Sequence, residues 1–220
     1  PDIIGTQETT LTWKSYFNNH LSEYTMIGCS REGKYSSSGE WSLILYRRDR
    51  FELLDNGDFW LSNTPDQVSV VEGSICKRIC TWALLKDKTT GKTFVIANTH
   101  LDHSNDTVRT AQIKVLLKEL GDLITKYPLF LTGDFNTQPS STVYDAVAVK
   151  LVDASKTAAE NKSTINHTFD NYGTKNPGIT IDYCFYNNKK IDAFWFTIAN
   201  EQFGGYVSDH YAVVGEFLLK

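Results

Sequence analysis

Short apolar runs, separated by polar turns and amphipathic stretches, recur along the whole chain. The runs are rich in β-branched and aromatic residues, which is typical of strands. The predicted strands are Trp41–Tyr46, Ile79–Leu85, Thr93–Asn98, Leu129–Thr132, Ile181–Tyr186, Ala193–Ile198 and Ala212–Leu218. Because no repeat, low-complexity tract or linker interrupts the series, the pattern predicts a single domain over residues 1–220.

Helical spacing of apolar positions marks fewer segments. Helices are predicted over Thr107–Tyr127, Ser141–Val149 and Thr12–Leu21. The first of them joins two strands and ends before Pro128, because proline disfavours helical backbone in the residue that precedes it. The segment Lys86–Lys92 lies between two strands and is typical of a hairpin connection, with Gly91 in the turn. Strand–hairpin and strand–helix–strand units together predict mixed sheets.

The length, composition and net charge of the chain favour some classes of protein over others. The chain has 220 residues and is 41% hydrophobic, which suits one globular core. With 22 Lys+Arg against 26 Asp+Glu, the net charge is −4, so a duplex-binding protein with a basic footprint is disfavoured. Nucleic acid stays possible as a partner, because bound divalent cations add positive charge where a phosphate sits. No apolar stretch approaches the roughly 20 residues that span a bilayer.

The four cysteines and the N-terminal residues add little about function. No CxxC pair occurs, so the cysteines are interpreted as buried thiols, and a zinc pair of Cys76 and Cys80 is disfavoured because no second pair follows. The chain begins Pro-Asp-Ile-Ile-Gly without Met or a signal peptide, so localisation is not assigned beyond a slight preference for the cytoplasm.

The most reactive side chains follow directly on apolar strands, where a rigid element can hold them at the edge of a sheet. One strand breaks at Gly133 and delivers Asp134 and Asn136, which lie two apart and therefore on one face if the chain is extended. A carboxylate and an amide there can bind a hard cation and hold a water. The alternative is an Asx turn with no chemical role.

Three other strand ends carry candidate groups. Asp209 and His210 precede the last strand and offer a metal ligand and a proton-transfer group. Asp182 lies inside an apolar strand, where a buried carboxylate needs a partner; a histidine held by it would be oriented and made more basic. His100 ends another strand and can donate to a phosphate oxygen. At each of these positions a surface or structural role is the competing interpretation.

Two weaker candidates are Glu8, an acidic residue after the short apolar stretch Ile3–Gly5, and Arg78, which begins a strand. The planar guanidinium of Arg78 can hold a phosphate or can pair with a surface acid.

Taken in order, these motifs resemble the endonuclease/exonuclease/phosphatase superfamily. They are Gln7-Glu8, Arg78, Thr99-His100-Leu101, Gly133-Asp134-Phe135-Asn136, Ile181-Asp182-Tyr183 and Ser208-Asp209-His210. The resemblance implies an α/β fold of DNase I type: a four-layer α/β sandwich, with two mixed β-sheets packed face to face and helices outside. It also implies a Mg²⁺ or Mn²⁺ cofactor, and oxygen donors in the candidate set agree with a hard cation.

The resemblance also assigns expected roles. Glu8 and Asp209 are the expected metal residues. The expected catalytic residues are Asp134 and Asn136 for the attacking water, His210 oriented by Asp182, and His100. Phosphate oxygens are expected to contact His100, Asn136 and Arg78. Members of the superfamily begin with a strand that carries an Asn and precedes the Pro-Asp-Ile-Ile segment, so we expect this domain to lack its N-terminal strand.

The sequence therefore predicts a metal-dependent phosphoesterase that cleaves a phosphodiester or phosphomonoester by in-line attack of activated water. Candidate substrates are nucleic acid, a nucleotide, a phospholipid head group or an inositol phosphate, and the protein is expected to act as a monomer. The alternative is a catalytically inactive scaffold that binds a phosphorylated ligand.

Overall fold

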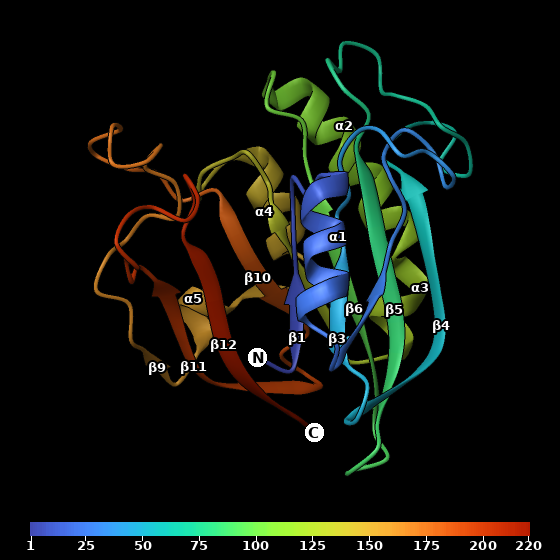
Figure 1. Ribbon diagram of the computed structural model, residues 1–220, viewed down its shortest axis with the longest axis vertical. Helices are drawn as coiled ribbons and strands as arrows, with labels where there is room; N and C mark the ends of the chain where they lie inside the picture. The colour runs from blue at the N-terminus through green and yellow to red at the C-terminus, as the bar shows by residue number, and fades with distance from the viewer.

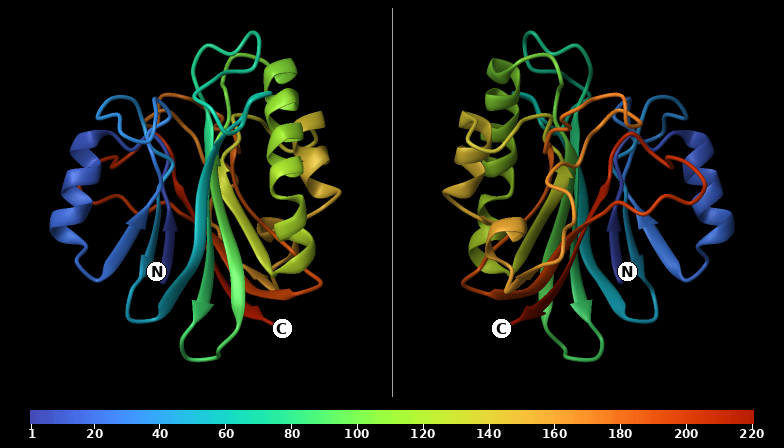
Figure 2. Two further views of the ribbon diagram at one scale, coloured as in Figure 1. Left: turned by 90° about the vertical axis from the view of Figure 1, so that its right-hand side faces the viewer. Right: turned by 90° about the vertical axis from the view of Figure 1, so that its left-hand side faces the viewer.

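Two layers of β-sheet pack face to face between two layers of helix in the computed structural model, which describes residues 1–220. Figure 1 and the side views of Figure 2 show the strands running roughly vertically, with the blue helix α1 on one side and the green helices on the other. The predicted α/β sandwich of DNase I type is therefore confirmed.

A six-stranded mixed sheet forms one of the two inner layers. In spatial order its strands are β4 (Phe51–Trp60), β5 (Ile79–Asp87), β6 (Thr93–His100), β7 (Leu129–Asp134), β10 (Asp182–Tyr186) and β8 (Val152–Asp153). Only β6 and β7 run parallel, and the other neighbours are antiparallel. The parallel pair needs a long crossover, which the helices between β6 and β7 supply.

The facing layer consists of two three-stranded sheets rather than one continuous sheet, because no hydrogen-bonded ladder joins them. One contains β1 (Ile3–Gly5), β3 (Ile44–Arg47) and β2 (Tyr24–Ile27), and the other contains β12 (Ala212–Leu219), β11 (Ile191–Ala199) and β9 (Glu160–Asn161). The first is antiparallel throughout, whereas β9 runs parallel to β11.

Helices cover the outer faces. The elements are α1 (Leu11–His20), α2 (Asp106–Glu119), α3 (Gly121–Lys126), α4 (Thr142–Ala148) and the one-turn α5 (Ala154–Thr157). Apolar residues of α2 and α4, such as Ile113 and Val147, join the largest core cluster with the six-stranded sheet. On the other side, Phe17 of α1 packs against the cluster around Leu43 and Leu45. No helix is both long enough and apolar enough to cross a membrane.

Most predicted elements are present, with informative differences. The helix predicted over Thr107–Tyr127 is two helices, because the chain breaks where Leu120 ends α2 and Gly121 begins α3. The strand β4 was not predicted, since Asp55–Asp58 interrupt its alternation and a bulge follows Leu53. Three cysteines are buried and all four are free thiols.

A buried amide ties the two sheet layers together beside the predicted site. Asn98 of β6 donates from Nδ2 to the carbonyl oxygens of Thr6, at 2.8 Å, and Leu43, at 3.0 Å. Its Oδ1 accepts from Nε2 of Gln7 at 2.7 Å. Gly5 allows this approach, because a Cβ there would lie 2.7 Å from Oδ1 of Asn98. The segment that carries Glu8 is thus fixed to the central sheet.

Candidate active site

Strand register places three of the predicted residues in one row. In the β6–β7 ladder His100 lies opposite Asp134, and in the β7–β10 ladder Asp134 lies opposite Asp182. Neighbouring strands lie about 4.8 Å apart, so side chains at one level meet. Gly133 permits this register, since a Cβ at that position would lie 2.1 Å from the carbonyl oxygen of Thr99. The three groups therefore come from sequence positions far apart but from adjacent strands.

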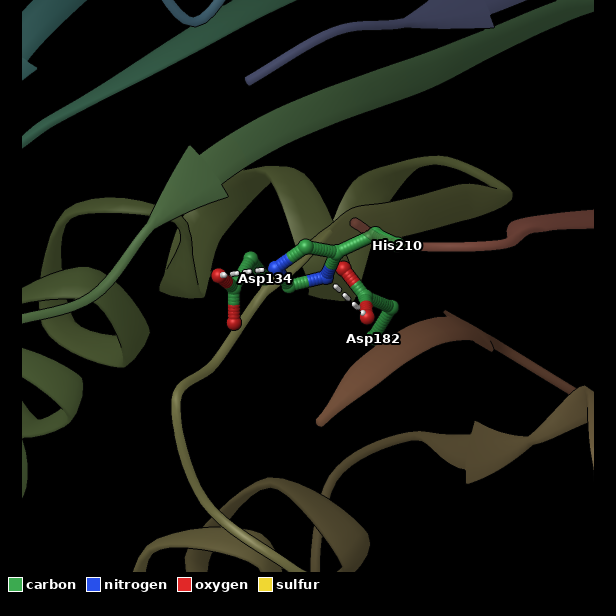
Figure 3. A group of neighbouring side chains, drawn as sticks. All are labelled: Asp134, Asp182 and His210. Atoms are coloured by element: carbon green, nitrogen blue, oxygen red, sulfur yellow. Dashed lines mark hydrogen bonds and ion pairs between the residues drawn. The ribbon is translucent and has the colours of Figure 1, made fainter. Parts of the chain in front are cut away.

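His210 joins this row from the loop before β12, between the two carboxylates, as Figure 3 shows. Its Nδ1 lies 2.8 Å from Oδ2 of Asp182, and its Nε2 lies 3.9 Å from Oδ2 of Asp134. The ring of Phe169 packs 4.8 Å from the imidazole, centroid to centroid. The expected contact between Asp182 and His210 is present.

Burial and the two carboxylates have opposite effects on the pKa of His210. Burial alone would lower the pKa, but the hydrogen bond to Asp182 and the negative charges of Asp182 and Asp134 raise it to about 9. The His210 ring is therefore protonated at neutral pH in this arrangement, with Nδ1–H donating to Asp182.

Asp134 and Asn136 come together through the Asx turn that was the alternative to an extended chain, and Nδ2 of Asn136 donates to Oδ2 of Asp134 at 3.4 Å. Asn136 has a φ of 49°, and its backbone N–H donates to Oδ1 of Asp134 at 2.7 Å. Asparagine tolerates this left-handed backbone better than most residues. The turn aims Nδ2 of Asn136 at the carbonyl oxygen of Leu101 and at Nε2 of His100, each 3.0 Å away. The same turn therefore also brings the amide of Asn136 next to His100.

His100 and Asp134 are both buried and both have shifted pKa values. Burial, then the positive charge of Arg78, lowers the pKa of His100, so the ring is neutral and its Nε2 can accept from the amide of Asn136. The same Nε2 lies 3.3 Å from Oδ2 of Asp134. Burial, then the negative charge of Asp182, raises the pKa of Asp134 to about 7.

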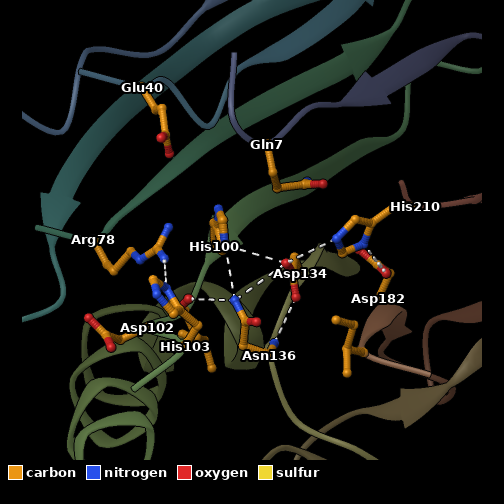
Figure 4. Close-up of polar contacts among 12 residues, drawn as sticks. Gln7, Glu40, Arg78, His100, Asp102, His103, Asp134, Asn136, Asp182 and His210 are labelled. Atoms are coloured by element: carbon orange, nitrogen blue, oxygen red, sulfur yellow. Dashed lines mark hydrogen bonds and ion pairs between the residues drawn. The ribbon is translucent and has the colours of Figure 1, made fainter. Parts of the chain in front are cut away.

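Glu8 and His100 both line a cavity of about 10 Å³, which suits one water-sized group. The cavity is lined by Glu8, Arg31, Glu40, Trp41, Ser42, Lys77, Arg78, Ile79 and His100. Burial, then the negative charges of Glu40 and Asp209, raises the pKa of Glu8. Glu8 also has a φ of 52°, an uncommon backbone for glutamate. Figure 4 places Glu40, Arg78 and His100 on this side and His210 on the other.

Arg78 is buried, with 5% of its surface exposed, and no carboxylate lies within ion-pair distance of it. Its Nη2 donates to Nδ1 of the exposed His103 at 3.2 Å, and its Nε has no hydrogen-bond partner. A buried guanidinium without an acidic partner is costly. It lines the cavity beside Glu8 and is the group in the site best suited to an anion.

The side chains that lie closest together as possible metal ligands are Asp134, Asp182 and His210, whose donor atoms all lie within 4.8 Å of one another. Glu8 and Asp209 are outside that group, although their charges act on each other. Carboxylate oxygens suit a hard divalent cation, but the protonated His210 already lies between Asp134 and Asp182. No cysteine belongs to such a group, so the structure offers no support for a zinc pair.

Sequence reasoning missed Arg31, Glu40 and Lys77, which line the cavity beside Glu8. Arg31 pairs with Glu40 at 2.6 Å, and Lys77 pairs with Glu32 at 2.6 Å. These residues lie in loops without a strand pattern, so no local signal distinguishes them from ordinary surface charges.

Asp102 was also given no separate role, and it is fully buried. Its Oδ2 accepts from Oγ of Ser74 at 2.6 Å and from the backbone N–H of Ile75 at 3.2 Å. Asp102 thus ties the loop that leads to Arg78 to the end of β6.

The two sheet layers, with acidic and histidine side chains gathered where their strands end, define a protein of the DNase I-like fold class. A family model described as the Endonuclease/Exonuclease/phosphatase family matches residues 1–210. The chain belongs to this family, whose name covers nucleases and phosphatases.

Two solved structures from Bacteroides cover almost the whole chain. The endonuclease/exonuclease/phosphatase from Bacteroides vulgatus is 31% identical, with a TM-score of 0.94, covering 100% of this chain and 85% of that one. The mannosyl-6-phosphatase Bt3783 from Bacteroides thetaiotaomicron is 31% identical, with a TM-score of 0.91, covering 99% of this chain and 85% of that one.

Among the curated relatives, Protein angel of Drosophila melanogaster is 30% identical over 146 residues, which are 64% of this chain and 41% of that protein. The chain spans less than half the length of the curated relatives it matches.

Proposed function

We propose that this protein hydrolyses a phosphate ester with the help of a divalent cation, by in-line attack of water on phosphorus. One observation carries the proposal: the row of His100, Asp134 and Asp182, completed by His210, lies beside a buried arginine that has no acidic partner. Negative groups to hold a cation and water, and positive groups to hold an anion, thus occur side by side. In-line phosphoryl displacement requires both.

The cation would be Mg²⁺ or Mn²⁺, held by Glu8 and Asp209. Their carboxylates, together with Glu40, repel one another, as the raised pKa of Glu8 indicates. A cation of this kind supplies positive charge to the phosphate oxygens and makes water more acidic.

The other side chains of the site would have separate roles in the hydrolysis. Asp134, whose pKa of about 7 suits a general base, and Asn136 would orient the attacking water. His210, held by Asp182 and protonated at neutral pH, would stabilise the developing charge and protonate the leaving oxygen. Neutral His100, Asn136 and Arg78 would contact the non-bridging oxygens.

The identity of the ester belongs to the same proposal. Nucleic acid, a nucleotide, a phospholipid head group and an inositol phosphate are all candidates. Similarity to the mannosyl-6-phosphatase adds a hexose phosphate to this set.

A panel assay tests the proposal. Purified protein is incubated with Mg²⁺, Mn²⁺ or EDTA and with mannose 6-phosphate, inositol phosphates, sphingomyelin, and single-stranded and duplex nucleic acid. We expect turnover of at least one ester that stops in EDTA. Glu8→Ala should weaken Mn²⁺ binding, measured by paramagnetic relaxation, while the exposed control Glu72→Ala should not.

Two outcomes would contradict the proposal. Absence of turnover on the whole panel, with thermal stabilisation by a phosphorylated compound, would favour the inactive scaffold. Turnover that persists undiminished in EDTA would exclude the cation.

A further inference from the structure

A second cavity, of about 340 Å³, lies beside Asp182 and has no role in the proposed hydrolysis. It is bounded by α5, the segment 161–168, the start of β10 and the middle of β11. It shares no lining residue with the cavity at Glu8, and neither His210 nor Asp134 lines it. Its volume is within the range of small-molecule sites.

The position of Asp182 separates this cavity from the phosphate side of the site. Asp182 and Asp134 contact different nitrogens of the His210 ring, as Figures 3 and 4 show. Only Oδ2 of Asp182 is engaged by His210, which leaves Oδ1 for a group in the cavity. A molecule bound there would contact Asp182 directly and would affect His210 through the hydrogen bond between the two residues.

The lining combines an apolar floor with short hydroxyl and amide groups. Tyr183, Phe196 and Ile198 are buried and supply apolar surface. The polar lining includes Ser155, Ser163, Asn166, Thr168 and Thr180. The hydroxyls of Thr168, Thr180 and Ser163 already take part in hydrogen bonds to the backbone. The side chains of Ser155 and Asn166 have no such partner, and since a hydroxyl and an amide both donate and accept, they match a ligand that does the same.

The charges of the lining residues narrow the classes of ligand that fit this cavity. The cavity has no Lys or Arg in its lining, and its charged residues are Asp153 and Asp182. An anion is therefore repelled. Asp153 accepts from Oη of Tyr144 at 2.9 Å and from the N–H of Ser155 at 2.8 Å, and Asp182 is paired with His210. Because both carboxylates already have partners, a neutral donor fits better than a cation.

We propose that this cavity binds a small neutral polyhydroxylated molecule, a hexose or cyclitol, with one hydroxyl donating to Asp182. Its hydroxyls meet the serine, threonine and asparagine side chains, and its C–H face lies on the aromatic floor. Binding requires neither cation nor turnover, so it does not depend on the proposed function.

The test measures binding without chemistry. D-mannose and myo-inositol are titrated into the protein in EDTA by calorimetry, and the histidine side chains are followed by ¹⁵N NMR. We expect saturable binding of at least one sugar, with a dissociation constant on the order of 1 mM or below, and a shift of the His210 resonance on saturation.

Two variants place a larger side chain in the cavity, one from α5 and one from the segment 161–168. Asn166 and Ser155 form no side-chain hydrogen bonds, so Asn166→Phe and Ser155→Leu are both expected to fold and to weaken binding at least tenfold. Asn188→Phe, at an exposed turn outside the cavity, is the matched control and should bind as the parent does.

Absence of sugar binding at concentrations on the order of 10 mM, or binding in both filled variants equal to that of the parent, would overturn the inference. Preferential binding of inorganic phosphate or ethanolammonium at this cavity would overturn the assigned ligand class. Failure of ester hydrolysis would leave the inference intact, because the two measurements are independent.

Discussion

Replacing Asp134 by asparagine should stabilise the protein at alkaline pH in the absence of metal. The carboxyl is 4% exposed and lies opposite Asp182 in the ladder, so its charged form is penalised by burial and by a like charge. Asparagine keeps the oxygen that accepts from the N–H of Asn136 but carries no charge. The variant therefore removes the cost of ionisation and retains the turn.

The size of the effect follows from the pKa. A carboxyl whose pKa rises from its ordinary 3.8 to about 7 on folding contributes stability that is complete below pH 3.8 and is lost as the pH rises to 7. The difference between these two pKa values corresponds to about 4 kcal/mol in the free energy of unfolding. Part of the gain is offset because the charge of Asp134 also supports protonated His210. We expect a net stabilisation of about 2 kcal/mol at pH 8.

Urea unfolding in EDTA at several pH values measures this difference, and thermal melting should show a rise of roughly 4–8 °C at pH 8. Asp182→Asn is the matched control, with the opposite expectation. Against the effect of burial, the hydrogen bond and charge of Asp182, with the charges of Asp134 and Asp209, raise the pKa of His210 from 6.5 to about 9. The resulting stability is complete below pH 6.5 and is lost as the pH rises to 9, and the contribution of Asp182 is part of it. Asp182→Asn should thus destabilise by about 1–2 kcal/mol at pH 6.

The reasoning about Asp134 would be refuted by a destabilised Asp134→Asn protein at pH 8, or by a stability difference from the parent that does not grow between pH 5 and pH 8. Equal effects of the two substitutions would show that burial, and not the charge of each group, determines stability here.

Further predictions concern activity and folding. His210→Ala should lower kcat by at least about 10²-fold while leaving the Mn²⁺ affinity unchanged, and equal kcat would exclude a catalytic role. Asp182→Asn should lower kcat about 10²–10⁴-fold through misorientation of that ring; a rate within twofold of the parent contradicts this. Arg78→Lys should raise KM for the ester more than it lowers kcat, because the planar fork is lost; an unchanged KM would remove Arg78 from phosphate binding. Gly133→Ala should cost more than about 3 kcal/mol, since its Cβ would meet the Thr99 carbonyl; a native melting temperature would refute that clash.

Strand ends could be predicted from the sequence because each is a local feature. The apolar runs before His100 and Asp134 fix where the strands stop, and the register of β6, β7 and β10 then brings their ends into one row. The resemblance to a known family predicted that these strand ends form one site. Neither source indicates the cavity beside Asp182, whose walls come from segments without a pattern in common.

What sequence reasoning could not supply is mainly long-range pairing. Glu40 and Arg31 form an ion pair across a loop whose ends are held by the bridge between Ser30 and Trp41. The strand β4 depends on nine paired positions with β5 and overrides the low strand propensity of Asp55–Asp58. In both cases tertiary contacts determine the structure, whereas the local pattern gives no signal for the ion pair and disfavours the strand.

The row of polar groups carries an electrostatic cost that a bound ligand would lower. Like charges placed directly opposite each other in a sheet are destabilising, yet Asp134 and Asp182 occupy such positions and Asp134 is almost fully buried. In the cavity that His100 also lines, the charge of Glu40 raises the pKa of Glu8, and Arg78 is buried without an acidic partner. A cation beside the carboxylates and an anion beside the arginine would relieve both costs at once. Electrostatic repulsion of this kind, concentrated at adjacent strand ends, supports the proposed binding of a cation and a phosphate ester.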